Sequence, residues 1–177
     1  MNYLPKLFST GAIRETPKKV LERIADEITP ATTHIPMVIE FGAGMGEITE
    51  PVLQKLGHEA PEYYAFEIDE ESCSLLKEKL PQVRVLSHSA LDFERYVPMD
   101  VQADYIISSM PLSFFKNEVL ETFLQMVKAR LRSDGKFILI FSAAWMLPVY
   151  KKHFPTLKTQ AFLTFPPYFM SVYEQEA

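Results

Sequence analysis

Three glycines at alternate positions form the pattern in this sequence that is best suited to chemistry. Gly42, Gly44 and Gly46 follow an apolar run that ends at Phe41, and helical spacing of apolar residues resumes after them. Glycine lets the backbone turn tightly, and its missing Cβ lets a ligand approach the main chain. The pattern therefore predicts a strand, a ligand-binding turn and a helix.

Carboxylates beside this turn narrow the kind of ligand. A dinucleotide-binding fingerprint has its third glycine one position later, where this chain has Glu47. Glu40, at the end of the first strand, would repel a pyrophosphate but attract a ligand that carries an ammonium and a sulfonium. Glu67 ends the next predicted strand, where a carboxylate can accept hydrogen bonds from ribose hydroxyls. S-Adenosylmethionine has these groups and no phosphate, so the residues favour it as the cofactor.

The elements that must position these residues alternate between strand and helix. Thr16 is expected to cap the first helix, and Val119 and Phe123 to lie on the buried face of the last one. The expected strands are 35–41, 63–68, 83–86, 103–108 and 136–141, and the expected helices are 17–28, 48–56, 70–80 and 117–132.

The C-terminal segment does not continue the alternation of strand and helix. Residues 157–165 and 168–174 are two strand patterns joined across Pro166 and Pro167 with no helix between them. Together the patterns predict an α/β fold with a doubly wound, mostly parallel sheet and an antiparallel final hairpin. Ligands of such sheets bind at the carboxyl ends of the strands. We expect a single domain over residues 1–177, with an N-terminal helical or lid segment at 1–33 and the core at 34–177.

Composition limits the classes of protein that this chain can belong to. Its 177 residues are 47% hydrophobic and 23% charged, which is typical of a packed globular protein. The net charge of -5 argues against nucleic acid as a partner. Cys73 has no partner for an internal disulfide, no secretory signal pattern is present, and no apolar run is long enough to span a membrane. We therefore predict a cytoplasmic protein.

The segment from Val38 to Gly46 resembles motif I of class I S-adenosylmethionine-dependent methyltransferases, and Phe66 to Asp69 is similar to their acidic motif. The resemblance implies a Rossmann-like, seven-stranded sheet, S-adenosylhomocysteine as a product and no metal. Ser89 stands where the family often has an aspartate that binds the adenine amino group, while Asp92 could equally cap a helix. The residues implied in cofactor binding are Glu40, Gly42, Ala43, Gly44, Gly46, Glu67, Ile68, Ser89, Ala90 and Ser108.

The fourth strand runs into Ser108, Ser109, Met110 and Pro111, at the position where amine methyltransferases carry an Asn/Asp-Pro-Pro-aromatic motif. An amine must point its lone pair at the methyl carbon, so oxygen acceptors and close walls are needed to orient its hydrogens. Proline fixes such a turn. By this resemblance, these four residues are the expected catalytic residues.

The residues of this stretch also indicate which of two methyl acceptors, RNA adenine or a phospholipid amine, the chain would use. Ser109 and Leu112 replace the asparagine and the stacking aromatic of rRNA adenine dimethylases. The stretch is more similar to the Ser-Gly-Leu-Pro-Leu pattern of bacterial phospholipid N-methyltransferases, and residues 11–13 and 165–167 also resemble short segments of that family. This implies methylation of phosphatidylethanolamine. The expected substrate contacts are Leu112, Phe114, Phe115, Trp145 and Tyr168.

Residues 3–23 mix apolar side chains with Lys6, Arg14, Lys18, Lys19 and Arg23. Such a segment can bind the inner face of a membrane peripherally, form a lid over the cofactor, or simply present a solvated helix face. Two other functions stay open from the sequence: methylation of RNA adenine, and binding of S-adenosylmethionine without catalysis.

Overall fold

The computed structural model describes residues 16–30, 33–57 and 61–176. Within them, seven strands form one sheet in the order β3-β2-β1-β4-β5-β7-β6. The pairs among β1 to β5 are parallel, whereas β7 is antiparallel to both β5 and β6. This confirms the predicted Rossmann-like sheet. The strands are β1 (Met37–Phe41), β2 (Glu62–Glu67), β3 (Arg84–Ser87), β4 (Ala103–Ser108), β5 (Leu131–Phe141), β6 (Lys158–Phe162) and β7 (Tyr168–Glu174).

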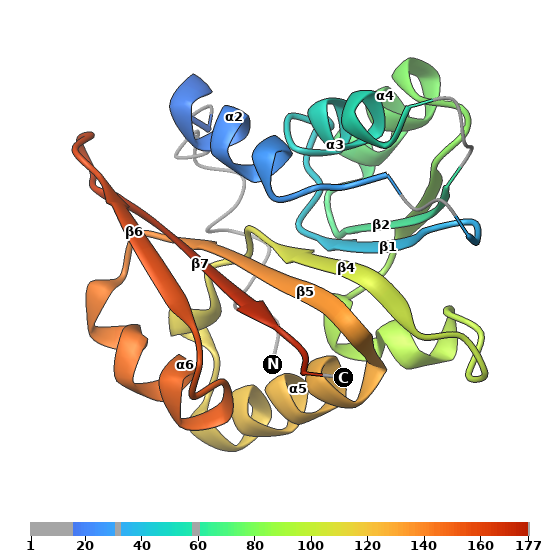
Figure 1. The fold of residues 1–177 in the computed structure, drawn as a ribbon. Coiled ribbons are helices and arrows are strands. Elements are labelled where there is room, and N and C mark those ends of the chain that lie inside the picture. The colour runs from blue at the N-terminus through green and yellow to red at the C-terminus, as the bar shows by residue number, and fades with distance from the viewer. Residues whose placement is uncertain (1–15, 31–32, 58–60, 177) are drawn as a thin grey trace.

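Helices cover both faces of the sheet (Figure 1). On one face lie α2 (Lys18–Asp26), α3 (Thr49–Leu56) and α4 (Glu70–Lys79), and on the other lie α5 (Asn117–Arg130) and α6 (Leu147–His153). Three short 3-10 helices are η1 (Ala90–Arg95), η2 (Leu112–Phe114) and η3 (Ala144–Met146). Each face encloses a hydrophobic cluster of buried side chains, so the sheet forms the middle of three layers.

The N-terminal helix α2 packs on the core. Val20, Ile24 and Ile28 are at most 1% exposed and belong to the same cluster as α3 and β1. Thr16 does not cap this helix, because its side chain accepts no capping bond and its N–H donates to Glu47. The predicted boundary at residue 33 stays a prediction, and the N-terminal contacts expected of residues 1–15 lie outside the described residues.

The predicted helix 117–132 ends two residues early, because Leu131 already begins β5. The strand turns at Asp134, whose φ is 66°, and continues through Gly135. A Cβ on Gly135 would lie 2.9 Å from the Ala103 carbonyl oxygen, so glycine is required for this approach. Val119 was expected to be buried but is 39% exposed, which places it at the margin of the buried helix face.

The parallel strands end at one edge of the sheet, which we call the carboxyl edge. Phe41, Glu67, Ser108 and Phe141 are the last residues of β1, β2, β4 and β5. Phe141 pairs with Phe169, so residues 163–167 between β6 and β7 lie beyond the end of β5. Figure 1 shows this hairpin tip projecting at the upper left, away from the body of the sheet.

Candidate functional site

The glycine turn after β1 is fixed by the neighbouring strand β2. The N–H groups of Gly42 and Ala43 both donate to the carbonyl of Phe66, at 2.8 and 3.2 Å. Gly42, Gly44 and Gly46 have φ values of 79°, 53° and 89°, a region that side chains with a Cβ rarely enter. The turn therefore requires glycine for its backbone conformation.

Space around the turn distinguishes two of these glycines. A Cβ on Gly46 would lie 2.6 Å from Cδ1 of the buried Leu76 in α4, whereas a Cβ on Gly44 would meet no atom of the described residues within 4 Å. Gly46 thus permits close packing of the turn on α4. Gly44 has open space beside its backbone, and its contact with a ligand stays a prediction.

Glu67 is held against the turn by backbone hydrogen bonds. Its Oε2 accepts from the N–H of Gly44 at 2.9 Å, and its Oε1 accepts from Ile68 and Asp69 at 2.7 and 3.0 Å. These three bonds fix the orientation of a carboxylate that has further lone pairs to offer. Asp69 caps α4 through the N–H of Ser72, and this contact lowers the pKa of Asp69.

Glu40 lies beneath the turn and is fully buried. Its Oε2 accepts from the hydroxyls of Thr49 and Tyr63 at 2.7 and 2.6 Å. Burial raises the pKa of Glu40 to about 7, while the two hydroxyls act in the opposite direction and the negative charge of Glu67 raises it further. The pKa of this carboxyl group therefore lies near neutral pH. Its contact with a cofactor stays a prediction.

Two buried polar atoms at the carboxyl edge have no hydrogen-bond partner among the described residues. They are Oε1 of Glu40 and Oγ of Ser108, on neighbouring strands. Buried polar atoms of this kind are normally satisfied by protein, water or ligand. Together with the open backbone at Gly44 and the oriented Glu67, they fit a cofactor that carries both polar and positively charged groups.

The edge beyond β3 carries the residues expected near adenine. The Ser89 hydroxyl accepts from the N–H of Leu91 at 3.2 Å and caps η1, which is the role considered for Asp92. Asp92 instead pairs with Arg95 at the surface. Ala90 is buried, whereas Ile68 after β2 is 42% exposed and offers apolar surface at this edge. Adenine contacts of Ser89 and Ile68 stay predictions.

His88 lies on the surface beside these residues. Its ring stacks on Tyr96 with a centroid distance of 4.2 Å and an interplanar angle of 12°. The exposed ring thus packs against a neighbouring aromatic side chain.

The segment after β4 is fastened to the glycine turn. The Ser109 hydroxyl donates to the Gly42 carbonyl at 2.7 Å, and its N–H donates to the Phe41 carbonyl at 3.1 Å. A Cβ on Gly42 would lie 3.1 Å from Cγ of Met110. Pro111 then precedes η2. Ser109 and Met110 are therefore brought to the cofactor turn, while the side chain of Ser108 is buried.

The five residues expected to contact substrate separate into two groups. Leu112 is 1% exposed and packs in the core, because η2 folds its side chain inward, so it does not face a substrate as expected. Phe115 and Tyr168 are partly buried against the two hydrophobic clusters. Phe114 and Trp145 are 58% and 74% exposed, at the ends of β4 and β5. These four stay candidates.

Thr49 and Tyr63 are the site residues that the sequence analysis missed. Both bind Glu40, and both are hidden in the core. Thr49 occupies a helix position near the turn, but Tyr63 reaches Glu40 only through the pairing of β1 with β2. The sequence carried no local signal for that contact.

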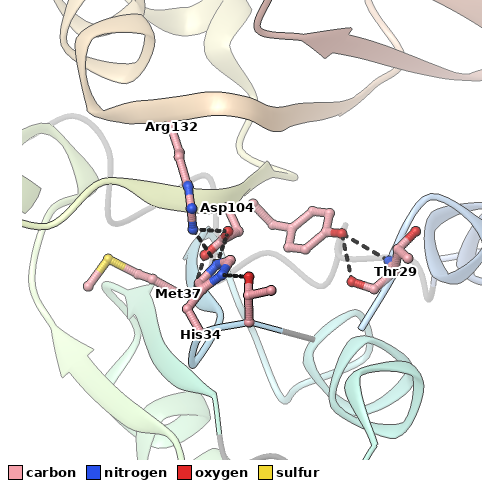
Figure 2. A network of polar contacts seen from close by, with 7 residues as sticks. Thr29, His34, Met37, Asp104 and Arg132 are labelled. Atoms are coloured by element: carbon pink, nitrogen blue, oxygen red, sulfur yellow. Dashed lines mark hydrogen bonds and ion pairs between the residues drawn. The ribbon is translucent and has the colours of Figure 1, made fainter. Parts of the chain in front are cut away.

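A second polar cluster lies at the opposite, amino-terminal edge of the sheet (Figure 2). Asp104 accepts from the Met37 N–H at 2.9 Å, contacts His34 at 2.6 Å and pairs with Arg132 at 3.2 Å. His34 and Arg132 also meet directly. Because the residues come from the starts of β1, β4 and β5, the cluster ties these strands together away from the glycine turn.

Residues 16–30, 33–57 and 61–176 contain neither a metal-ligand cluster nor a membrane-spanning helix. No group of three or more histidine, cysteine, aspartate or glutamate side chains there could hold a metal ion. No helix there is both long and apolar enough to cross a membrane.

Comparison with solved structures places the fold among methyltransferases. An S-adenosylmethionine-dependent O-methyltransferase from Thermotoga maritima has a TM-score of 0.69 at 12% identity, covering 97% of this chain and 70% of that one. An rRNA methylase from Streptococcus thermophilus has a TM-score of 0.61 at 14% identity, covering 93% and 99%. A 16S rRNA methyltransferase from T. thermophilus, solved with its cofactor and guanosine, has a TM-score of 0.65 at 20% identity, covering 94% and 45%.

Sequence comparison gives two further matches. An ornithine lipid N-methyltransferase from Singulisphaera acidiphila is 25% identical over 123 residues, which are 67% of this chain and 64% of that protein. The family model described as a methyltransferase domain matches residues 39–137, more than half of the chain and including the glycine turn, Glu67 and Ser109. The chain therefore belongs to the methyltransferase domain family, and it shares the fold of an S-adenosylmethionine-dependent methyltransferase of known structure.

Proposed function

We propose that this chain transfers the methyl group of S-adenosylmethionine to the amine of a phospholipid headgroup of the phosphatidylethanolamine type. The proposal is carried by the hydrogen bond from the Ser109 hydroxyl to the Gly42 carbonyl, which ties the acceptor segment to the cofactor turn. The similarity to an ornithine lipid N-methyltransferase supports an amine on a lipid as the acceptor. The resemblance of residues 108–112 to phospholipid N-methyltransferases supports the same class.

Glu67, Gly44 and Glu40 are the residues that would hold the cofactor. Glu67 would accept from the ribose hydroxyls, since its backbone bonds have already oriented it. Gly44 leaves room for close approach, and Glu40 places a titratable carboxyl beneath the turn. When bound, S-adenosylmethionine supplies an electrophilic methyl group on a sulfonium and leaves as S-adenosylhomocysteine.

Ser109 would orient the amine. Its hydroxyl hydrogen is engaged by Gly42, so its oxygen lone pairs remain as acceptors for an amine N–H. The nitrogen lone pair forms the new N–C bond as the S–C bond breaks, and the extra proton on nitrogen leaves to solvent. Catalysis by these residues is mainly positioning, because the methyl donor is already activated.

The test measures label transfer from methyl-labelled cofactor to vesicles of phosphatidylethanolamine and, separately, to total RNA. Ser109→Ala should lower kcat on the lipid about 10- to 100-fold and leave the cofactor Kd within about threefold. Ser113→Ala, a serine in the adjacent η2, is the matched control and should retain activity. Label in RNA instead of lipid, or full activity of Ser109→Ala, would overturn the proposal. Cofactor binding without any transfer would indicate a non-catalytic protein.

A further inference from the structure

Large apolar side chains are exposed at the carboxyl edge. Phe114, Trp145, Leu163 and Phe165 are 58%, 74%, 103% and 90% exposed. We call these four residues the apolar rim. They come from three separate segments, after β4, after β5 and between β6 and β7, yet all lie at the strand ends where the acceptor segment lies. Exposed apolar side chains that gather in this way mark an interaction surface.

The segments that carry the apolar rim contain no charged residue. Residues 105–115, 137–150 and 159–173 lack Asp, Glu, Lys and Arg altogether. Their exposed parts therefore have no charge that would have to be desolvated on entering an apolar phase. Trp145 adds an indole, which is favoured at the boundary between lipid tails and headgroups.

Lysines follow or flank the segments of the apolar rim, although the whole chain has a net charge of -5. Lys116 follows the Phe114 segment directly, and Lys151 lies one turn into α6 after the Trp145 segment. Lys19 is exposed at the start of α2. The start of this helix lies near the glycine turn, because the N–H of Thr16 donates a hydrogen bond to Glu47. Glu118 is the acidic residue nearest in sequence to Lys116. Exposed lysines around an apolar surface favour an anionic bilayer as its partner.

We infer that the apolar rim inserts into the headgroup region of an anionic phospholipid bilayer and presents the carboxyl edge to the membrane. The inference rests on the proposed function for its purpose, since a lipid amine could then reach Ser109 without leaving the bilayer. The hairpin tip, which projects furthest beyond β5, contributes Leu163 and Phe165 (Figure 1). All four residues of the apolar rim belong to the described part of the chain.

Flotation with vesicles of equimolar phosphatidylethanolamine and phosphatidylglycerol tests the docking surface directly. Leu163→Ser combined with Phe165→Ser should lower the partition coefficient at least about tenfold. The matched control combines Ile35→Ser with Met99→Ser, because these residues are 65% and 87% exposed but precede β1 and β4 at the other edge. The control should bind vesicles like the wild-type chain. Equal binding by all three proteins, or equal losses in both variants, would overturn the inference.

Activity on a short-chain, water-soluble phosphatidylethanolamine separates docking from chemistry. The rim variant should retain transfer to this dispersed acceptor and lose transfer to vesicles. Loss of both activities would show that the rim acts in the acceptor site rather than in docking, and would overturn the inference. If the wild-type chain methylates no lipid but its flotation still depends on the rim, the proposed function fails and the docking surface stands.

Discussion

The ends of β1, β2 and β3 form one half of the carboxyl edge. The ends of β4 and β5, together with the turn between β6 and β7, form the other half, and the side chains of the two halves differ in kind. The cofactor half (residues 42–47, 67–69 and 87–92) carries carboxylates and backbone groups that are already bonded to one another, as Glu67 is to Gly44. The acceptor half (residues 109–115, 142–147 and 163–168) has no charged residue and exposes Trp145 and Leu163.

This difference indicates two kinds of partner. A preorganised polar surface suits one small molecule whose groups are always in the same places. An exposed apolar surface of separate loops suits a partner that is broad and lacks a fixed shape, such as a bilayer. The Ser109 to Gly42 hydrogen bond is the point at which the two halves meet.

The largest expected effect comes from crowding the cofactor half. Gly46→Ala places a Cβ against buried Leu76 at a positive φ and should lower the free energy of unfolding by about 3 kcal/mol. Gly44→Ala has the same kind of backbone strain but open space, so it should cost only about 1 to 2 kcal/mol. Urea unfolding of both variants measures the difference. Equal losses would mean that packing on α4 does not shape the turn.

Glu40 should make the cofactor half sensitive to pH. Burial raises its pKa from 4.5 to about 7, so the folded protein keeps a proton that the unfolded chain releases between these values. The free energy of unfolding should therefore fall by up to about 3 kcal/mol as pH rises from 4.5 to 7, and this contribution should level off above pH 7. Glu40→Gln should lack this fall. Unfolding curves of both proteins across this range test it, and parallel pH dependences would contradict it.

Glu67→Gln should weaken cofactor binding, because a neutral amide is a poorer acceptor for the Gly44 N–H and for ribose hydroxyls. The expected loss is about 2 kcal/mol, or roughly 30-fold in Kd. Calorimetric titration with S-adenosylmethionine measures it. Glu71→Gln, at an exposed position in α4, controls for the change in net charge and should bind normally. Similar losses in both variants would remove the specific role of Glu67.

The smallest effect is expected in the acceptor half. Trp145 is 74% exposed, so Trp145→Ala should change the free energy of unfolding by less than about 0.5 kcal/mol. Thermal or urea unfolding would check this. A loss as large as that of Gly46→Ala would show that Trp145 supports the core, and the contrast between the two halves would then fail.

Local patterns predicted most of the fold. The bounds of β4 match residues 103–108, and α3 ends before Gly57, because apolar spacing and glycine act within a few residues. The sequence likewise placed Glu67 and Ser109 at strand ends. Local sequence patterns did not predict contacts that depend on strand pairing or on the rotation of a short helix. Tyr63 meets Glu40 across two strands, and η2 turns Leu112 inward while leaving Phe114 exposed.

The hairpin of β6 and β7 forms one border of the sheet and joins it only through β5 among the described residues. Its tip at residues 163–167 lies beyond that pairing, so its length and side chains can change while the register from Phe141 with Phe169 is kept. If the tip docks on the membrane as inferred, membrane affinity can therefore diverge between related proteins, or be exchanged by grafting, without rebuilding the glycine turn. The hairpin tip is thus free to vary in sequence, whereas backbone hydrogen bonds hold the glycine turn in one conformation.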